Sequence, residues 1–440
     1  MIPALLEPRI LNLEPATPPC HHFGSCGGCQ FQDLSYADQL KLKSDRLRTL
    51  LEAAGLSLPE LHLHPSPPLA YRNRIRLTLA ERNGRLRAGY LTTAQPDPSN
   101  LAPRTSNLAF IPITQCPVTA PILWRATEAL LEELNRRSAV WIEGAHFTFD
   151  QLELFTDAVE SNLQISLFVR TSAKSHPAKF TSELASFCES VRTKIPALTG
   201  AGIYLIPPRL VRSRRTEVPR PGPNWGAPGL NYTVSAKDQI VILSAAQNLG
   251  GSSLPLPASQ PTTLNLEPQT YWVPRTAFFQ VNRYLLPELL TLVTASRTGQ
   301  LAFDLYAGVG LFTFALAPHF AHIISVEIAE PAFTALASTK LPNLHAVKAT
   351  TLDFLQTAIL QRDRPDLIVL DPPRSGAGRE VCALLARIGA PTLIYVSCSP
   401  EALPADLQVL AASGYTLAEL HLFDLFPQTN HIETVAILTR

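Results

Sequence analysis

The second half of the chain alternates between strand and helix patterns, and this alternation constrains the fold more than any other feature. From Tyr271 onward, short runs of branched and aromatic residues alternate with segments of helical periodicity, and two consecutive strands, roughly 415–424 and 431–439, end the chain. Such a pattern predicts an α/β domain with a mostly parallel sheet, helices on both faces and an antiparallel terminal hairpin. The other predicted strands are 301–305, 322–327, 343–348, 366–370 and 392–397, and the predicted helices are 310–318, 330–340, 379–388 and 401–412.

The chain has 440 residues, which is too long for one compact core. We predict an N-terminal segment over 1–64 with a cysteine-rich loop and a helix, a central α+β domain over 65–270, and the α/β domain over 271–440. Charged residues make up 17% of the chain and no apolar run is long enough to span a membrane, so we expect no membrane partner. Because no secretory signal is visible, we expect a cytoplasmic protein with reduced thiols.

Cys398 stands where the apolar strand 392–397 ends and a helix is expected to begin. Pro400 and Glu401 suit the first turn of a helix, with Ser399 as its cap. The positive end of that helix would favour a thiolate, which is the reactive form of cysteine. A lone cysteine at a strand end can also be a small buried hydrophobe, so the interpretation depends on its neighbours.

Two acids are expected at the same edge of the sheet as Cys398. Asp371 follows the strand 366–370 and precedes two prolines, and ligands of open α/β sheets bind at this edge. Glu433 lies in the last hairpin among apolar residues, where a carboxylate is costly unless it has a partner or a task. The three side chains predict one pocket with a nucleophile and at least one proton acceptor.

The first strand of the α/β region ends in a glycine turn. Gly308 and Gly310 allow a tight turn and close approach to a ligand, while Thr313 stands at the third glycine of a dinucleotide fingerprint. Glu327 ends the next strand, where an acid can accept hydrogen bonds from both hydroxyls of a ribose. Together these features predict an adenosine ligand without a diphosphate, a description that S-adenosylmethionine fits.

Four cysteines form a second group, with three in C-x5-C-x2-C spacing and a distant fourth. They are Cys20, Cys26, Cys29 and Cys116. Such a set suits an iron–sulfur cluster or zinc, and the spacing does not choose between them. His21 and His22 are alternative zinc ligands, although adjacent side chains diverge. The two remaining cysteines, Cys188 and Cys382, are predicted core residues.

Together, these residues resemble the RNA uracil-C5-methyltransferases, the S-adenosylmethionine-dependent family that makes 5-methyluridine in ribosomal or transfer RNA. The resemblance runs from the Cys20 group to Glu433 and includes the segment Phe278-Phe279-Gln280-Val281-Asn282. It implies that Cys398 is the nucleophile and Glu433 the proton acceptor, and Leu311 departs from the Asn that many members have there. With the residues it adds, the predicted cofactor set is Gln280, Tyr306, Gly308, Gly310, Glu327 and Asp371.

The resemblance also implies a Rossmann-like methyltransferase domain preceded by an α+β RNA-binding domain. It implies a 4Fe-4S cluster held by the four grouped cysteines, in the type without an N-terminal TRAM barrel, since Cys20 comes too early for one. We expect a monomer that acts on ribosomal RNA in preference to transfer RNA. Two alternatives stay open: a methyltransferase acting on another RNA position, which needs no thiol, and an RNA-binding iron–sulfur protein with a degenerate methyltransferase fold.

Arginines in the central region are candidate RNA contacts. Several alternate through a predicted hairpin around Asn83-Gly84, which puts their guanidinium groups on one sheet face, suited to phosphates and exposed bases. The net charge is only +1, so any RNA contact must come from local patches such as these. An ordinary solvated face is the alternative. The candidates are Arg72, Arg74, Arg76, Arg212 and Arg214.

Overall fold

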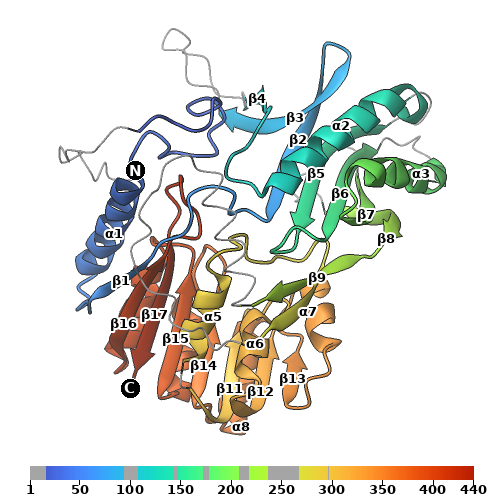
Figure 1. Cartoon of the computed structure of the whole chain (residues 1–440). Coiled ribbons are helices and arrows are strands. Elements are labelled where there is room, and N and C mark those ends of the chain that lie inside the picture. The colour runs from blue at the N-terminus through green and yellow to red at the C-terminus, as the bar shows by residue number, and fades with distance from the viewer. Residues whose placement is uncertain are drawn as a thin grey trace.

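In the computed structural model, the described residues are 16–93, 108–142, 147–171, 178–207, 218–235, 267–295 and 297–440. Within these stretches the strands form three sheets, of eight, seven and two strands. The eight-stranded sheet, mostly orange to red, forms a lower lobe, and the seven-stranded sheet, blue to green, forms an upper lobe (Figure 1). No helix in the described stretches is long and apolar enough to cross a membrane.

The eight-stranded sheet has the order β1-β16-β17-β15-β14-β11-β12-β13. Its strands are β1 (Leu61–His64), β11 (Gly299–Leu305), β12 (Phe320–Val326), β13 (Leu344–Val347), β14 (Leu367–Leu370), β15 (Thr392–Ser397), β16 (Thr416–Phe423) and β17 (Glu433–Thr439). Neighbours among β11 to β15 pair in parallel, and β17 is antiparallel to both β15 and β16. The predicted Rossmann-like sheet with an antiparallel terminal hairpin is confirmed.

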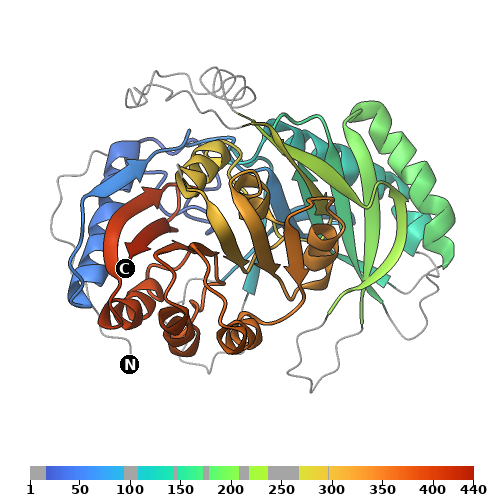
Figure 2. The same ribbon diagram turned by 90° about the horizontal axis from the view of Figure 1, so that it is seen from below.

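Helices cover both faces of this sheet (Figure 2). They are α5 (Leu286–Thr294), α6 (Leu311–Leu316), α7 (Glu330–Ala337), α8 (Thr351–Gln361), α9 (Arg379–Ile388) and α10 (Leu403–Ala412). Val369 and Ile394 share a core cluster with α5 to α7, whereas their neighbours Ile368 and Leu393 share one with α8 to α10. Successive strand residues point to opposite faces, so strands buried on both sides have continuous apolar runs. α8 is a helix that the sequence pattern above does not include.

The upper lobe contains the seven-stranded sheet in the order β4-β3-β2-β5-β6-β7-β8. Its elements are β2 (Arg74–Arg82), β3 (Arg85–Thr93), β4 (Leu108–Pro112), α2 (Pro121–Ile142), β5 (Phe147–Thr156), β6 (Leu163–Thr171), α3 (Ala178–Lys194), β7 (Leu198–Ile206) and β8 (Arg220–Gly226). Apolar residues of α2 and α3 pack on one face of the sheet. Asn83 and Gly84 have φ of 54° and 71°, as a two-residue hairpin turn requires, so the predicted hairpin is confirmed.

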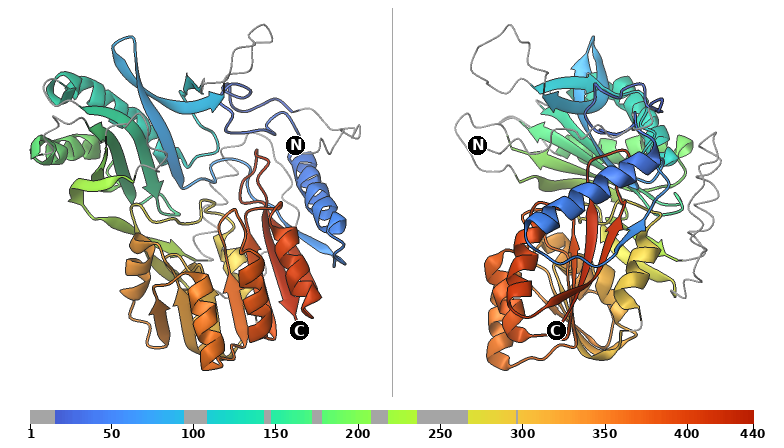
Figure 3. Two further views of the ribbon diagram at one scale, coloured as in Figure 1. Left: turned by 180° about the vertical axis from the view of Figure 1, so that it is seen from behind. Right: turned by 90° about the vertical axis from the view of Figure 1, so that its left-hand side faces the viewer.

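The N-terminal segment joins the lower lobe. Ser35 caps helix α1 (Tyr36–Ala53), and its hydroxyl accepts a hydrogen bond from the backbone N–H of Asp38 at 3.2 Å. Leu47 and Leu51 of this helix are fully buried in the cluster that also contains α8 to α10. β1 pairs in parallel with β16, so the predicted division at residue 64 falls where the chain leaves this sheet. Figure 3 shows α1 crossing beside the red terminal strands.

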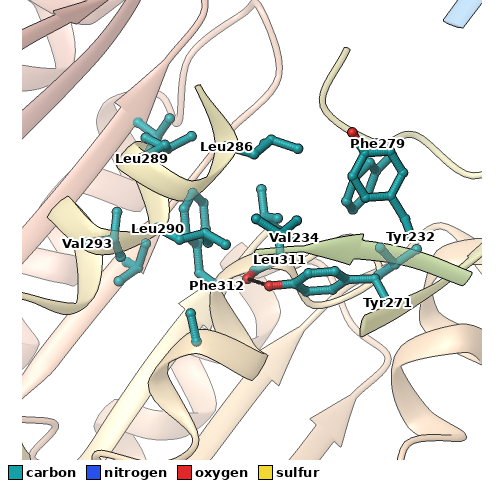
Figure 4. Packing of buried hydrophobic residues seen from close by; sticks show 14 of the residues in the cluster. Tyr232, Val234, Tyr271, Phe279, Leu286, Leu289, Leu290, Val293, Leu311 and Phe312 are labelled. Atoms are coloured by element: carbon teal, nitrogen blue, oxygen red, sulfur yellow. Dashed lines mark hydrogen bonds between the residues drawn. The ribbon is translucent and has the colours of Figure 1, made fainter. Parts of the chain in front are cut away.

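A small sheet of β9 (Gly229–Val234) and β10 (Gln269–Pro274) lies between the lobes. Its residues Tyr232 and Tyr271 are fully buried and pack with Phe279 and with α5 and α6 (Figure 4). The hydroxyl of Tyr271 donates a hydrogen bond of 3.1 Å to the backbone oxygen of Leu311. The Leu311 side chain belongs to this core, which runs from Phe155 of the upper lobe to the terminal strands of the lower one. One continuous core therefore fixes the two lobes relative to each other.

Candidate active site

Three candidate residues meet at the edge of the lower sheet where its parallel strands end. Cys398 follows β15, and Asp371 follows the neighbouring parallel strand β14. β17 runs antiparallel to β15, so its first residue, Glu433, lies at the same edge. Ser397 is paired with Thr434, which places Cys398 beside Glu433. The structure thus brings together the three side chains that the sequence assigns to one edge.

Burial and neighbouring carboxyls shift these side chains toward their neutral forms. Burial, followed by the nearby carboxyls of Glu433 and Asp371, raises the pKa of the Cys398 thiol to about 11. Burial and the proximity of Asp371 raise the pKa of Glu433 well above its usual range, and burial raises the pKa of Asp371 to about 7. Arg374 acts in the opposite direction and lowers the pKa of both Cys398 and Glu433. Within the described residues, Oε1 of Glu433 is buried and has no hydrogen-bond partner, which is costly unless the carboxyl has a task.

The expected helix start after Cys398 needs a correction. α10 begins at Leu403, and the hydroxyl of Ser399 accepts a 3.3 Å hydrogen bond from the backbone of Ala402 within the preceding turn. The dipole of a helix acts within its first turn, so at this distance it does little for the thiol. Burial beside two carboxyls outweighs it, and the thiol pKa is raised where the sequence predicted a lowered one. The Cys398 thiol is therefore protonated at neutral pH in the free protein.

Cys398 opens onto a pocket of about 200 Å³. Its lining residues are Arg46, Arg374, Cys398, Ser399, Pro400, Glu401, Asn430, His431 and Ile432. Sequence reasoning did not single out Arg374 as a site residue. Its position in the Asp-Pro-Pro-Arg segment that follows β14 was the feature that could have indicated it. It also missed the contribution of 430–432, because only the fold brings the β16–β17 loop to Cys398.

The glycine turn after β11 has the conformation that its residues suggest. Tyr306, Gly308 and Gly310 have φ of 61°, 58° and 97°, and a Cβ at Gly310 would lie 2.9 Å from the Leu336 side chain. Glu327 is oriented by this turn, because its carboxylate accepts hydrogen bonds from the backbone of Gly308 at 2.9 Å and of Ala329 at 2.6 Å. The turn and the acid therefore form one rigid unit at the strand ends.

The residue at the third-glycine position has a structural role. The hydroxyl of Thr313 donates a hydrogen bond of 2.5 Å to the buried carboxyl of Asp304 on β11. Burial raises the pKa of Asp304 to about 7, and the Thr313 hydroxyl moderates that shift. A glycine here would leave this acid without its side-chain donor.

Gln280 reaches Asp371 from the segment between the lobes. Its side chain is 5% exposed, and Nε2 lies 3.5 Å from an oxygen of Asp371, a long hydrogen bond. The backbone oxygen of Gln280 accepts a 3.0 Å hydrogen bond from Asn73, and the backbone oxygen of Ala277 accepts one of 2.8 Å from Arg74. The upper lobe thus positions Gln280 against the acid at the end of β14.

The four grouped cysteines line one cavity of about 70 Å³, although Cys116 is far from the others in sequence. They are Cys20, Cys26, Cys29 and Cys116. Burial raises the pKa of Cys116 to about 12, and the adjacent Arg72 opposes that rise. The described residues contain no group of three His, Cys, Asp or Glu side chains placed to hold a metal ion. Cys188 and Cys382 are fully buried in hydrophobic clusters, which confirms them as core residues.

The neighbouring histidines are engaged elsewhere. Nε2 of His22 accepts a 3.0 Å hydrogen bond from the backbone N–H of Thr114. The Thr114 hydroxyl lies 2.8 Å from Nε2 of His21 and 3.0 Å from Nε2 of His22. The lone pair that a metal would need on His22 is therefore already used.

Comparison with known proteins places this arrangement in a family. The 23S rRNA (uracil(1939)-C(5))-methyltransferase RlmD of Chromohalobacter salexigens is 30% identical over 443 residues, covering 99% of this chain and 79% of that protein. The chain belongs to the RNA uracil-C5-methyltransferase family. The family model described as tRNA (Uracil-5-)-methyltransferase matches residues 263–440. An uncharacterized RNA methyltransferase of Thermotoga maritima is 29% identical, with 96% of this chain and 84% of that protein covered.

A solved structure shows the same fold. The tRNA (uracil-54, C5)-methyltransferase of Pyrococcus abyssi, crystallised with S-adenosyl-L-homocysteine, superposes with a TM-score of 0.62. It is 21% identical in sequence, and the match covers 94% of this chain and 86% of that one. The chain is thus an RNA (uracil-5-)-methyltransferase, an enzyme of the EC 2.1.1 class.

The candidate RNA contacts of this methyltransferase differ in their surroundings. Arg72 borders the cysteine cavity and donates to the hydroxyl of Tyr71 at 3.4 Å. Arg74 lies over the Phe155 ring at 4.0 Å and pairs with Glu153 at 3.6 Å. The side chain of Arg76 is 47% exposed, so it is the one of these three that faces solvent. The other two candidates, Arg212 and Arg214, lie outside the described residues.

Proposed function

We propose that this enzyme transfers a methyl group from S-adenosylmethionine to C5 of a uridine in RNA, through a covalent bond between Cys398 and C6 of the base. The observation that carries the proposal is Cys398 beside the buried, unpartnered Oε1 of Glu433, at a pocket large enough to admit part of a ligand. The RlmD relatives of Chromohalobacter salexigens and Halomonas elongata, 30% and 27% identical, support ribosomal RNA in preference to transfer RNA.

The residues at the strand ends fit S-adenosylmethionine. When bound, it supplies a methyl group on a positively charged sulfonium. A carboxylate offers about four acceptor positions, so Glu327 can receive two ribose hydroxyls in addition to its two backbone N–H groups. Tyr306, Gly308 and Gly310 shape the adjoining turn, and Gln280 and Asp371 lie against each other at the end of β14. These six residues are the proposed cofactor contacts.

Cys398 begins the reaction by giving its proton to water that enters the pocket, and the resulting thiolate adds to C6 of uracil. The thiolate electron pair forms the S–C6 bond, and the C5=C6 electrons move toward O4, which makes an enolate with a nucleophilic C5. Arg374 lowers the pKa of the thiol and so favours its ionised form. After C5 has received the methyl group, Glu433 takes the C5 proton, the C5=C6 double bond reforms and the thiolate leaves.

The surroundings of Glu433 suit a proton acceptor. Burial raises the pKa of its carboxyl well above the usual range, so the ionised form is a stronger base than an exposed glutamate. Its 2% exposure also shields a proton in transit from bulk water. The target nucleotide must leave its stack to reach the pocket, which explains why an RNA loop or an unpaired nucleotide is the expected substrate.

Tritium release tests the proposed mechanism. RNA carrying 5-tritiated uridine should release tritium to water only with S-adenosylmethionine present and Cys398 intact. Cys188→Ala, which removes a thiol from the core of the upper lobe, is the matched control and should retain release. Undiminished release by Cys398→Ala would contradict the covalent mechanism. Methyl transfer to another RNA position by the same variant would favour the alternative reaction.

We propose further that the four-cysteine cavity holds a 4Fe-4S cluster. Its ligands would be Cys20, Cys26, Cys29 and Cys116, with Arg72 beside them to balance the negative charge of the thiolates. The four thiols line one cavity, a set that suits an iron–sulfur cluster or zinc, and the family resemblance favours the iron–sulfur cluster.

Iron and sulfide analysis of protein purified without oxygen tests the cluster. We expect about four irons and four sulfides per chain, a brown colour, and loss of all three in Cys116→Ser. Cys382→Ala, a change at a fully buried core thiol, should keep its iron. A colourless preparation with one zinc per chain would overturn the assignment.

The remaining parts of the proposed function are the RNA contact, the cellular location, the oligomeric state and the role of each lobe. Arg76 is the proposed RNA contact on the upper lobe, because its side chain is 47% exposed and its hydrogen bond to Gln151 lies at the surface, whereas the Arg74 side chain is 13% exposed and Arg72 borders the cysteine cavity. Seven free cysteines fit a reducing cytoplasm, and we propose that the enzyme acts there as a monomer. The upper lobe would then be an RNA-binding domain, and the lower lobe the methyltransferase domain.

A further inference from the structure

The loop between β16 and β17, residues 424–432, completes the Cys398 pocket and is called the pocket loop below. Its last three residues line the pocket, and the next residue is Glu433. Gln428, in its middle, has φ of 68°, a left-handed conformation that a non-glycine residue adopts only when its surroundings impose it. The position of this loop therefore sets both a wall of the pocket and the approach of Glu433, and something outside the loop must hold it.

Gln428 is held by residues almost four hundred positions earlier in the chain. Its backbone N–H donates to Oε1 of Gln39 at 2.9 Å, and its side-chain oxygen accepts from Nε2 of Gln39 at 3.0 Å. Its backbone oxygen accepts from the N–H groups of Gln30 at 2.9 Å and Phe31 at 3.1 Å. Gln39 is 1% exposed, so these hydrogen bonds form away from water. Every polar group of the Gln428 backbone is thus bound by the N-terminal segment.

Two further side chains on the same face of α1, Lys43 and Arg46, also tie the pocket loop to this helix. Nζ of Lys43 lies 2.6 Å from Asp424 and donates at 3.0 Å to the backbone oxygen of Phe426. Both side chains of this ion pair are essentially unexposed, and burial lowers the pKa of Lys43 and raises that of Asp424. Losing either partner would leave a buried charge, so the pair fixes the start of the loop.

The third tie joins the two walls of the pocket. Arg46 donates at 3.0 Å to the backbone oxygen of Asn430. It also forms an ion pair with Glu401, in the turn that follows Cys398. Positions 39, 43 and 46 recur at the spacing of one helix face, so a single rigid helix makes all three ties.

The cysteine segment is continuous with these ties. Gln30 and Phe31 directly follow Cys29, and the side chain of Gln30 donates at 2.8 Å to the backbone oxygen of Gly27. The backbone N–H of Cys20 donates at 3.1 Å to the side chain of Gln32. A change in the conformation of residues 20–29 would therefore reach Gln428 through two backbone hydrogen bonds.

We propose that Gln39 and Lys43 are positioning residues for methyl transfer, and that the ordered cysteine segment supports turnover by holding the pocket loop against Cys398. The inference rests on the proposed function of Cys398 and Glu433. It assigns the four-cysteine site a mechanical task at the catalytic pocket, without electron transfer. The ties reach the loop that leads to Glu433 and the residue Glu401, whereas the proposed cofactor contacts lie on other strand ends.

Gln39→Met removes the central tie with little change in side-chain length. We expect kcat for tritium release to fall roughly tenfold to a hundredfold, because a misplaced pocket loop weakens the alignment of Glu433. The dissociation constant of S-adenosylmethionine and the iron content should stay unchanged. Amide hydrogen exchange at 424–432 should accelerate. Gln164→Met is the matched control: it removes a buried glutamine that bonds Arg275 and Thr199 in the upper lobe and should leave kcat and loop exchange unchanged.

Cys26→Ser tests the link to the cysteine segment without relying on activity. In this iron-depleted variant, amide exchange at 424–432 should accelerate as in Gln39→Met, while exchange in β11 and β12 stays slow. Slow exchange of the loop in Cys26→Ser would overturn the coupling.

Unchanged kcat in Gln39→Met would overturn the positioning role. If Gln39→Met does not fold, Arg46→Met on the exposed edge of α1 should show a smaller loss of kcat, and its absence would count against the proposal. Failure of the unmodified enzyme to release tritium would refute the proposed function instead.

Discussion

Two thiol-lined pockets of this molecule have opposite surroundings. At the lower pocket a single thiol, Cys398, stands among Glu433, Asp371 and Arg374, two acids and one cation. At the upper pocket four thiols share one cavity with Arg72, and its lining residues include no carboxyl group. Burial raises the pKa of thiols in both places, to about 11 for Cys398 and about 12 for Cys116.

The comparison shows that burial alone does not distinguish a nucleophile from a ligand. Burial favours the protonated thiol at Cys398 and at Cys116, and each needs a partner that favours the thiolate. In the upper pocket the proposed metal centre would supply that partner and remain bound to it. In the lower pocket Arg374 favours the thiolate, and the proposed reaction needs a thiol that is free to form and break a bond. The neighbours, more than the thiol itself, define the chemistry of each site.

The largest expected effect is that the two pockets lose different properties when their thiols are replaced: Cys398→Ala loses tritium release, and Cys116→Ser loses iron. Cys398→Ala should reduce tritium release roughly a thousandfold or more and keep the iron, because it removes only the nucleophile. Cys116→Ser should lose the iron and retain the Cys398 thiol. Metal analysis and tritium release measured on both variants check this. Loss of iron from Cys398→Ala would mean that the Cys398 side chain is needed to hold the metal in the upper pocket, and would break the comparison.

Glu433→Gln tests the proposed proton acceptor of the lower pocket, a carboxyl group that has no counterpart among the residues lining the upper pocket. The variant can still add Cys398 to C6 and receive the methyl group, but it has no base for the C5 proton. Turnover should fall by about a hundredfold or more, and a covalent protein–RNA complex should accumulate. Denaturing gels with labelled RNA would reveal that complex. If turnover fell without any accumulated complex, Glu433 would act before methyl transfer and the proposed role would be wrong.

Much of the lower lobe could be predicted from sequence because its signals are local. Apolar runs such as Leu367–Leu370 and the strand ending before Cys398 identify themselves by composition, and acids at strand ends share an edge by the geometry of parallel sheets. The contribution of β1 could not be predicted this way. Its sequence Leu-His-Leu-His shows no sign of its partner, and its pairing with β16 joins residues more than three hundred and fifty positions apart.

The same limit applies to the site. Gln39 and Lys43 look like ordinary polar positions of an amphipathic helix, yet the fold buries both against the pocket loop. The thiolate expected at Cys398 failed for a related reason. The sequence places both carboxyls at the edge of the sheet that holds Cys398, but it does not show how deeply the three groups are buried. Burial is the largest cause of the raised thiol pKa, and it becomes visible only when the tertiary structure is known.

A smaller effect should come from the cation of the lower pocket. Because the pKa of Cys398 is about 11, its thiolate fraction rises about tenfold per pH unit through the neutral range, and the rate of adduct formation should rise with it. Arg374→Gln removes the group that lowers this pKa, so the profile should move to higher pH and the rate at neutral pH should fall about tenfold. Rapid-quench measurement of adduct formation on 5-fluorouridine RNA, with Arg374→Lys as the charge-preserving control, checks the shift. An unmoved profile would show that Arg374 does not act on the thiol.

The smallest expected effect concerns the loop that presents Arg374. The buried carboxyl of Asp406 accepts hydrogen bonds from the hydroxyl of Tyr395 at 2.6 Å and from the backbone of Ala377 at 2.8 Å and Gly378 at 3.1 Å. In Asp406→Asn, the side chain keeps one oxygen acceptor but turns an NH₂ group toward these donors, so one or two of the bonds are lost at about 1 kcal/mol each. We expect a fall in melting temperature of a few degrees and a severalfold loss of kcat. Tyr395→Phe removes a single bond from the same acid and should show about half the thermal effect with nearly full kcat. Equal kcat losses in the two variants would mean that the tyrosine bond, and not the backbone of the loop, sets the position of Arg374.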